Sequence, residues 1–116
     1  MAVNSDRTRL FVTVPNPSGA AKGQILVYNI DPKDRPTNST SNANNWHRQI
    51  GKVDAGLGVE GIAATPDPLK MVFTNRNEDA KGFGLLEITS NNPTGITAKT
   101  TKNTLNLVWL LILEYS

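Results

Sequence analysis

The chain contains no cysteine, which excludes disulfide bonds, thiolate nucleophiles and cysteine-ligated metal sites. Its single histidine, His47, has neither a second histidine nor a cysteine with which to form a conventional zinc site. Aromatic residues make up only 6% of the 116 residues, so a hydrophobic core has to consist mainly of aliphatic side chains. The redox compartment is left undecided by this composition.

Charge of one sign and long apolar runs are also lacking. The 12 basic and 10 acidic residues give a net charge of +2 and are scattered, whereas a nucleic-acid interface needs a clustered basic face. No stretch reaches the roughly 18–20 apolar residues that span a bilayer. Residues 1–9 lack the apolar segment of a signal peptide. We therefore expect no nucleic-acid partner and no membrane span, and the localisation is open.

Turn-forming residues are plentiful, with nine Gly and seven Pro in a chain of single-domain length. Short runs of β-favouring residues lie between the turns, which predicts an all-β fold. The expected strands are 8–14, 24–30, 46–53, 61–65, 69–75, 83–89 and 96–101. The apolar run 105–113 fits either a buried strand or a short buried helix.

The stretch 53–75, VDAGLGVEGIAATPDPLKMVFTN, combines a glycine-rich crossing, a short strand, a Pro-Asp-Pro turn and a second strand. It resembles the repeat of the YVTN-type β-propellers, whose pattern contains G-I-A-x-x-P-D-G and ends in V-T-N. The chain departs from this pattern at Val59, where the family has proline, at Pro68, where it has glycine, and throughout 105–116. The glycines also match G-x-G-x-x-G, but Pro66 and Pro68 prevent the helix that a dinucleotide site requires.

An internal repeat supports the resemblance. Residues 6–13 align with residues 67–74 at an offset of 61 positions, and Lys22-Gly23 aligns with Lys81-Gly82 at an offset of 59. This spacing exceeds the roughly 40–50 residues of a typical blade. The polar loop 31–45 accounts for the excess as an insertion.

The resemblance implies a β-propeller segment of about two four-stranded antiparallel blades, incomplete as a ring. Residues 1–53 are expected to form an incomplete blade without its innermost strand, with the loop insertion 31–45. Residues 54–101 form a complete blade, and 102–116 an apolar C-terminal strand or an atypical tail. Because a propeller needs about four to eight blades, the chain is a fragment of a larger propeller or a subunit of an oligomeric ring. A truncated reading frame without independent function is a third interpretation.

The function that the resemblance implies is a non-catalytic binding or scaffold module without a cofactor. Its partners would be a protein, peptide or glycan ligand, and other propeller blades or copies of the chain. The alternative is a part of a propeller hydrolase similar to the lactonases. Relatives in this family are often exported to the periplasm or cell surface.

Four residues are candidate ligand contacts. By its position in the repeat, Glu60 is expected to point toward the central channel, and Asn75 and Arg76 to border the same face. Trp46 lies beside the polar loop, where an exposed indole stacks on sugars. No catalytic residue and no metal ligand is predicted, and Asp31 and Asp34 are expected to be solvated loop charges because they lack the spacing of a calcium loop.

Overall fold

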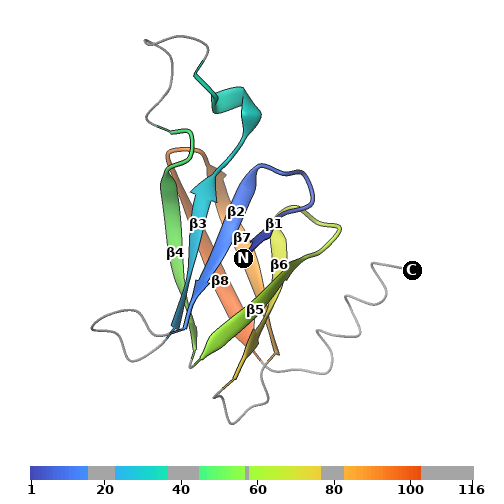
Figure 1. Ribbon diagram of the computed structural model, residues 1–116. Helices are drawn as coiled ribbons and strands as arrows, with labels where there is room; N and C mark the ends of the chain where they lie inside the picture. The colour runs from blue at the N-terminus through green and yellow to red at the C-terminus, as the bar shows by residue number, and fades with distance from the viewer. Residues whose placement is uncertain (16–22, 37–44, 57, 77–82, 103–116) are drawn as a thin grey trace.

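A computed structural model of the chain describes residues 1–15, 23–36, 45–56, 58–76 and 83–102. These residues form antiparallel strands and one short 3-10 helix, η1 (Pro32–Asp34), so the expected all-β class is confirmed (Figure 1). The strands are β1 (Ala2–Val3), β2 (Arg9–Val14), β3 (Gly23–Asn29), β4 (Gln49–Gly56), β5 (Val59–Ala64), β6 (Lys70–Asn75), β7 (Phe83–Asn92) and β8 (Gly95–Lys102).

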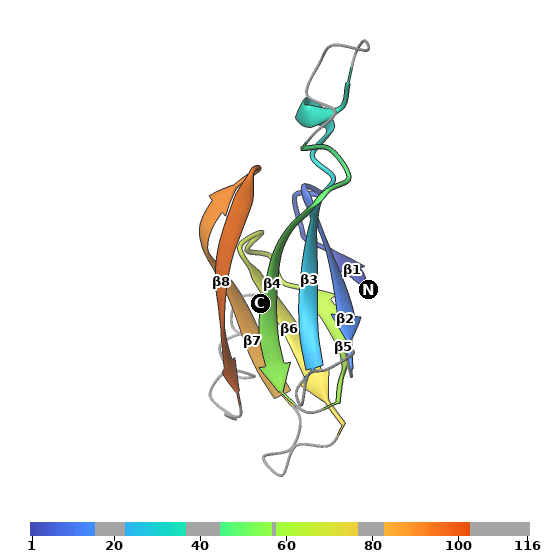
Figure 2. The same ribbon diagram turned by 90° about the vertical axis from the view of Figure 1, so that its left-hand side faces the viewer.

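The strands form two four-stranded antiparallel sheets, and each sheet follows the order of the chain. The N-terminal sheet has the order β1-β2-β3-β4, and the C-terminal sheet has the order β5-β6-β7-β8. The two sheets lie face to face, with β5 against β1 and β2 and with β8 against β4 (Figure 2). The first strand of the C-terminal sheet therefore lies over the first two strands of the N-terminal sheet, and the last strands of the two sheets lie against each other. Neither sheet closes on itself.

The hydrophobic core lies between the two sheets. In β3 every second residue from Gly23 to Asn29 is buried, as expected for a strand with one face against a core. The residues of β6 alternate in the same way, and so do the first four residues of β2. Removing these side chains from water is the main force that holds the sheets together. The core consists of Phe11, Ile25, Val27, Ile50, Ala55, Val59, Met71, Phe73, Leu86 and Ile88.

The connection between the sheets runs from β4 to β5 through a glycine-rich turn. Gly56 has φ 93° and Gly58 has φ 69°, a backbone region that other residues rarely adopt. The glycine-rich segment thus passes from one sheet to the other as a turn, and the Gly56–Gly61 motif does not open a helix.

The N-terminal sheet begins with a strand, β1, that was not among the strands expected from the sequence. β1 pairs with β2, with Ala2 opposite Phe11 and Val3 opposite Leu10. Asn4 closes the intervening turn, because its Oδ1 accepts hydrogen bonds from the backbone N–H groups of Thr8 and Arg9, both at 3.0 Å. A strand of two residues is too short to produce a recognisable alternation, so the sequence did not reveal it.

Two further expectations near the polar loop were wrong. β4 starts at Gln49 rather than at residue 46, because His47 has φ 61° and the backbone turns there. Asp31 is not a solvated loop charge: it is 8% exposed and its side chain accepts a hydrogen bond from the N–H of Lys33, capping η1. Residues 37–44 of the loop and the apolar run 105–113 lie outside the described residues.

Candidate functional site

Two of the predicted contacts, Glu60 and Arg76, meet at the end of the sheets where β4 passes into β5. The Glu60 Oε1 atom lies 3.0 Å from the Arg76 Nη2 atom, and the two side chains are 58% and 70% exposed. The backbone fixes both residues, because the Arg76 N–H donates to the Gly58 carbonyl at 2.8 Å and the Thr13 hydroxyl donates to the Glu60 carbonyl at 2.8 Å. Such an exposed pair contributes little stability, about 0–1 kcal/mol. Its charges are accessible to a ligand.

A small pocket of about 130 Å³ adjoins this ion pair and is lined by Pro15, Gly58, Glu60 and Arg76. It presents one carboxylate and one guanidinium beside a proline ring. This combination suits a polar segment of a peptide or a sugar hydroxyl better than an apolar ligand.

Asn75 does not share this surface, although it precedes Arg76 directly. It alternates with Met71 and Phe73 on the face of β6 that packs against the N-terminal sheet, and it is 7% exposed. Its Oδ1 atom is buried without a hydrogen-bond partner among the described residues. The expectation that Asn75 borders the Glu60 face was therefore wrong, because successive residues of a strand point to opposite faces.

We predict that Asn75→Leu leaves the free energy of unfolding unchanged or raises it by up to about 1 kcal/mol, since the substitution removes an unpaired buried acceptor and keeps the branched shape. Asn29→Leu is the matched control. Asn29 is 0% exposed, but its Nδ2 donates to Asp34 Oδ2 and to the Asn45 carbonyl, so this substitution should cost about 2 kcal/mol or more. Urea titrations of both variants test the prediction. Equal losses in the two variants would contradict it.

Trp46 lies at the opposite end of the sheets, before the first residue of β4. Its ring stacks on His47, with the centroids 3.5 Å apart and the planes at 24°, and the Arg35 guanidinium carbon lies 5.8 Å from its centroid. The stacked His47 ring therefore covers one face of the indole, and Trp46 is half-buried. The structure does not bring Trp46 together with Glu60 and Arg76.

The same end of the sheets contains a polar cavity of about 250 Å³ that the sequence did not predict. At its base lies Arg9, which is only 4% exposed. Arg9 Nη1 donates to Asn29 Oδ1 at 2.8 Å, and Arg9 Nε donates to Asn91 Oδ1 of the C-terminal sheet at 3.1 Å. The cavity is lined by Asp6, Thr8, Arg9, Asp31, Lys33, Asp34, Asn91 and Pro93. Arg9 thus ties the two sheets together.

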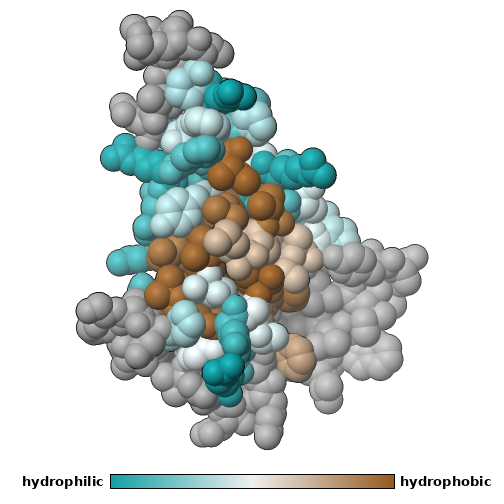
Figure 3. All heavy atoms as spheres, viewed as in Figure 1, coloured by the Kyte–Doolittle hydropathy of each residue, from teal (hydrophilic) through white to brown (hydrophobic). Residues whose placement is uncertain are grey.

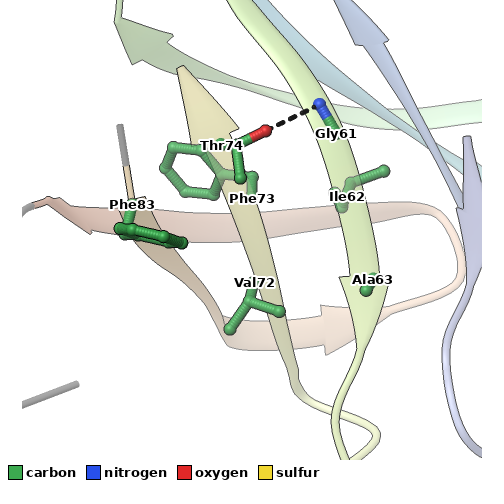
Figure 4. A pocket seen from close by; sticks show the side chains of 7 residues that line it. All are labelled: Gly61, Ile62, Ala63, Val72, Phe73, Thr74 and Phe83. Atoms are coloured by element: carbon green, nitrogen blue, oxygen red, sulfur yellow. Dashed lines mark hydrogen bonds between the residues drawn. The ribbon is translucent and has the colours of Figure 1, made fainter. Parts of the chain in front are cut away.

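A shallow apolar hollow of about 340 Å³ lies on the outer face of the C-terminal sheet (Figure 4). Phe83 stands at its rim and is 56% exposed. The Gly61 N–H donates to Thr74 Oγ1 across β5 and β6 at 3.0 Å, which holds the wall of the hollow. The lining residues are Gly61, Ile62, Ala63, Val72, Phe73, Thr74 and Phe83.

The outer face of the N-terminal sheet is apolar too. Apolar side chains gather at the centre of the face on which β2 and β3 lie (Figure 3). By the alternation of β2 and β3, the half-buried Leu10, Val12 and Leu26 point to this face, away from the core. The molecule therefore carries an apolar surface on each side of its two-sheet stack.

Within the described part of the chain, no three His, Asp or Glu side chains converge as a metal-binding group. No helix in that part is long and apolar enough to cross a membrane. Comparisons of the chain with protein-family models, with curated proteins and with solved structures gave no match.

Proposed function

We propose that the chain is a non-catalytic scaffold or binding module consisting of two consecutive blades of a β-propeller similar to the YVTN type. The observation that supports this proposal is the way in which the sheets stack. Both have the order of the chain, β5 lies over β1 and β2, and the last strands β4 and β8 lie against each other. Successive blades of a propeller are related in this manner around the central axis.

The apolar outer faces also support the proposal. In a closed ring each blade is covered on both sides, so that apolar residues on both faces of every sheet are expected. A free-standing two-sheet sandwich would instead be expected to present polar residues on its outer faces. The outer faces of this molecule carry Leu10, Val12 and Leu26 on one side and Val72 and Phe83 on the other.

The ligand would bind at the exposed ends of the blades rather than between the sheets. Glu60 and Arg76 offer opposite charges to a peptide or glycan at one end, and Trp46 offers a ring face at the other. The alternative hydrolase function depends on Glu60, and the Glu60 carboxylate is engaged in the ion pair with Arg76. Because this carboxylate is already paired with a cation, we favour the scaffold function.

A tandem protein tests the propeller proposal. Three full-length copies in one polypeptide should stack blade on blade, and the midpoint of thermal unfolding should rise by at least about 5 °C over the single chain, since each new interface adds stability. The tandem should also bind less of a dye specific for apolar surface per copy. An unchanged midpoint with dye binding proportional to the number of copies would mean independent units and would overturn the proposal.

A further inference from the structure

The repeat makes it possible to compare the faces of the two sheets residue by residue. The offset of 61 positions makes Phe11 equivalent to Val72. In the N-terminal sheet Phe11 pairs with Val27, and in the C-terminal sheet Val72 pairs with Leu85. The hydrogen-bonded register therefore makes Val27 equivalent to Leu85, without reference to any sequence alignment of β3 with β7.

The same reasoning applies one pair further along the strands. Thr13 is equivalent to Thr74 by the offset of 61. Thr13 pairs with Ile25, and Thr74 pairs with Phe83, which makes Ile25 equivalent to Phe83. Three pairs of equivalent apolar residues now describe one face in each sheet.

In the N-terminal sheet this face is fully covered: Phe11, Ile25 and Val27 are all 0% exposed. The C-terminal sheet covers it. The equivalent residues of the C-terminal sheet are Val72, Phe83 and Leu85, which point away from the core and line or flank the apolar hollow. The hollow thus lies on the face of the C-terminal sheet that is equivalent to the covered face of the N-terminal sheet.

The opposite faces correspond as well. Leu10 and Val12, on the outer face of the N-terminal sheet, are equivalent to Met71 and Phe73 by the same offset. Met71 is 0% exposed and Phe73 is 1% exposed, because they pack on the N-terminal sheet. The C-terminal sheet uses this face to cover the N-terminal sheet. The outer face of the N-terminal sheet is therefore the equivalent face, with which it could cover a preceding sheet.

From these equivalences we infer that a second copy of this chain stacks head to tail on the first. The outer face of its N-terminal sheet, with Leu10, Val12 and Leu26, covers the outer face of the C-terminal sheet of the first copy, with Val72 and Phe83. The contact repeats the sheet-on-sheet packing within one chain. The contact is heterologous, because it joins two different faces, and such contacts can close a ring by repeated rotation. Since each copy supplies two blades and a propeller has about four to eight, the ring would contain about two to four copies.

This inference rests on the proposed function. The sheet that covers each outer face belongs to a second copy of the same chain. Both halves of the required interface are present on one chain, and they differ from each other. A symmetric dimer would bury one of these faces against itself and leave the other exposed. Head-to-tail stacking covers both.

Two charged variants test the direction of stacking. Phe83→Glu disables the outer face of the C-terminal sheet, and Leu26→Glu disables that of the N-terminal sheet. We expect the full-length wild type to associate into a discrete oligomer by light scattering, and each variant alone to stay at 12.6 kDa. The association constant of each should fall by at least about 100-fold, because an unpaired carboxylate would be buried. Ser90→Glu, at an exposed position of β7, should associate as the wild type does.

Mixing the two variants gives the decisive result. Each retains the face that the other lacks, so a 1:1 mixture should form a heterodimer of twice the chain mass and nothing larger. Circular dichroism melts identify folded variants, and Val3→Glu replaces Leu26→Glu if the latter unfolds, since Val3 is 39% exposed on the same face. Association lost in one variant only, without rescue by mixing, would mean a symmetric dimer and would overturn the inference. A monomeric wild type would overturn it too, while stacking in the tandem protein would then leave the propeller proposal standing with other blades as the covering sheets.

Discussion

Phe73→Ala is expected to lower the free energy of unfolding by about 3–5 kcal/mol, enough to unfold a large share of molecules of a marginally stable domain. Phe73 is 1% exposed on the inner face of β6. Its ring lies over Gly84, in the space that a Cβ at this position would occupy. Because Gly84 has no side chain, it cannot fill the cavity that alanine would leave. Urea titration followed by circular dichroism measures the loss.

Phe83→Ala is the matched control for this prediction. The same side chain is removed, but Phe83 is 56% exposed, so the cost in the dissociated chain should stay below about 1 kcal/mol. The titrations should be made at a protein concentration at which the chains do not associate. Similar losses in the two variants would mean that the core does not lie between the sheets.

Arg9→Leu is expected to cost about 2–4 kcal/mol, although it replaces a charged side chain by an apolar one. The substitution leaves the Oδ1 atoms of Asn29 and Asn91 and the carbonyl of Thr8 without the donors that Arg9 provides. Hydrogen bonds to a charged group contribute about 1.5–3 kcal/mol each, and the loss of three of them is only partly offset, because Asn29 Oδ1 and the Thr8 carbonyl each keep one other donor. Because the bond to Asn91 joins the two sheets, hydrogen exchange should also accelerate at the end of β7.

Arg76→Leu is the control for the loss of a guanidinium. Arg76 is 70% exposed, and its ion pair with Glu60 is open to solvent. Removing the guanidinium should therefore change the unfolding free energy by less than about 1 kcal/mol. The small effect should vanish at about 1 M salt, where exposed charges are screened. If Arg9→Leu proves as mild as Arg76→Leu, the buried arginine does not tie the sheets.

Much of the strand pattern could be predicted from the sequence, because alternation and turn residues are local signals. The predicted strand 69–75 differs by one residue from β6, Lys70–Asn75. The start of β4 could not be predicted in this way. It depends on the left-handed backbone conformation of His47, which the pattern of side chains does not predict.

The candidate site was predicted only in part. Glu60 and Arg76 were chosen individually, and they meet because the antiparallel register of β5 and β6 places Val59 opposite Asn75. The burial of Asn75 and Arg9 could have been predicted from the sequence. Each lies two residues from a core phenylalanine on its own strand and therefore on the same face. Their hydrogen bonds could not be predicted in this way, because the partners of Arg9 lie on other strands and the Oδ1 atom of Asn75 has none among the described residues.

By itself, the sequence determined the all-β class, the places of the turns and the periodicity that gives each strand an apolar face, since these follow from neighbouring residues. Only the tertiary structure decided which face is covered. Leu10, Phe11 and Val12 read as one apolar run, yet Phe11 is 0% exposed and its two neighbours point outward. Burial depends on which sheet lies against which face, and that contact joins residues far apart in the chain, such as Phe11 on β2 and Phe73 on β6, within one core.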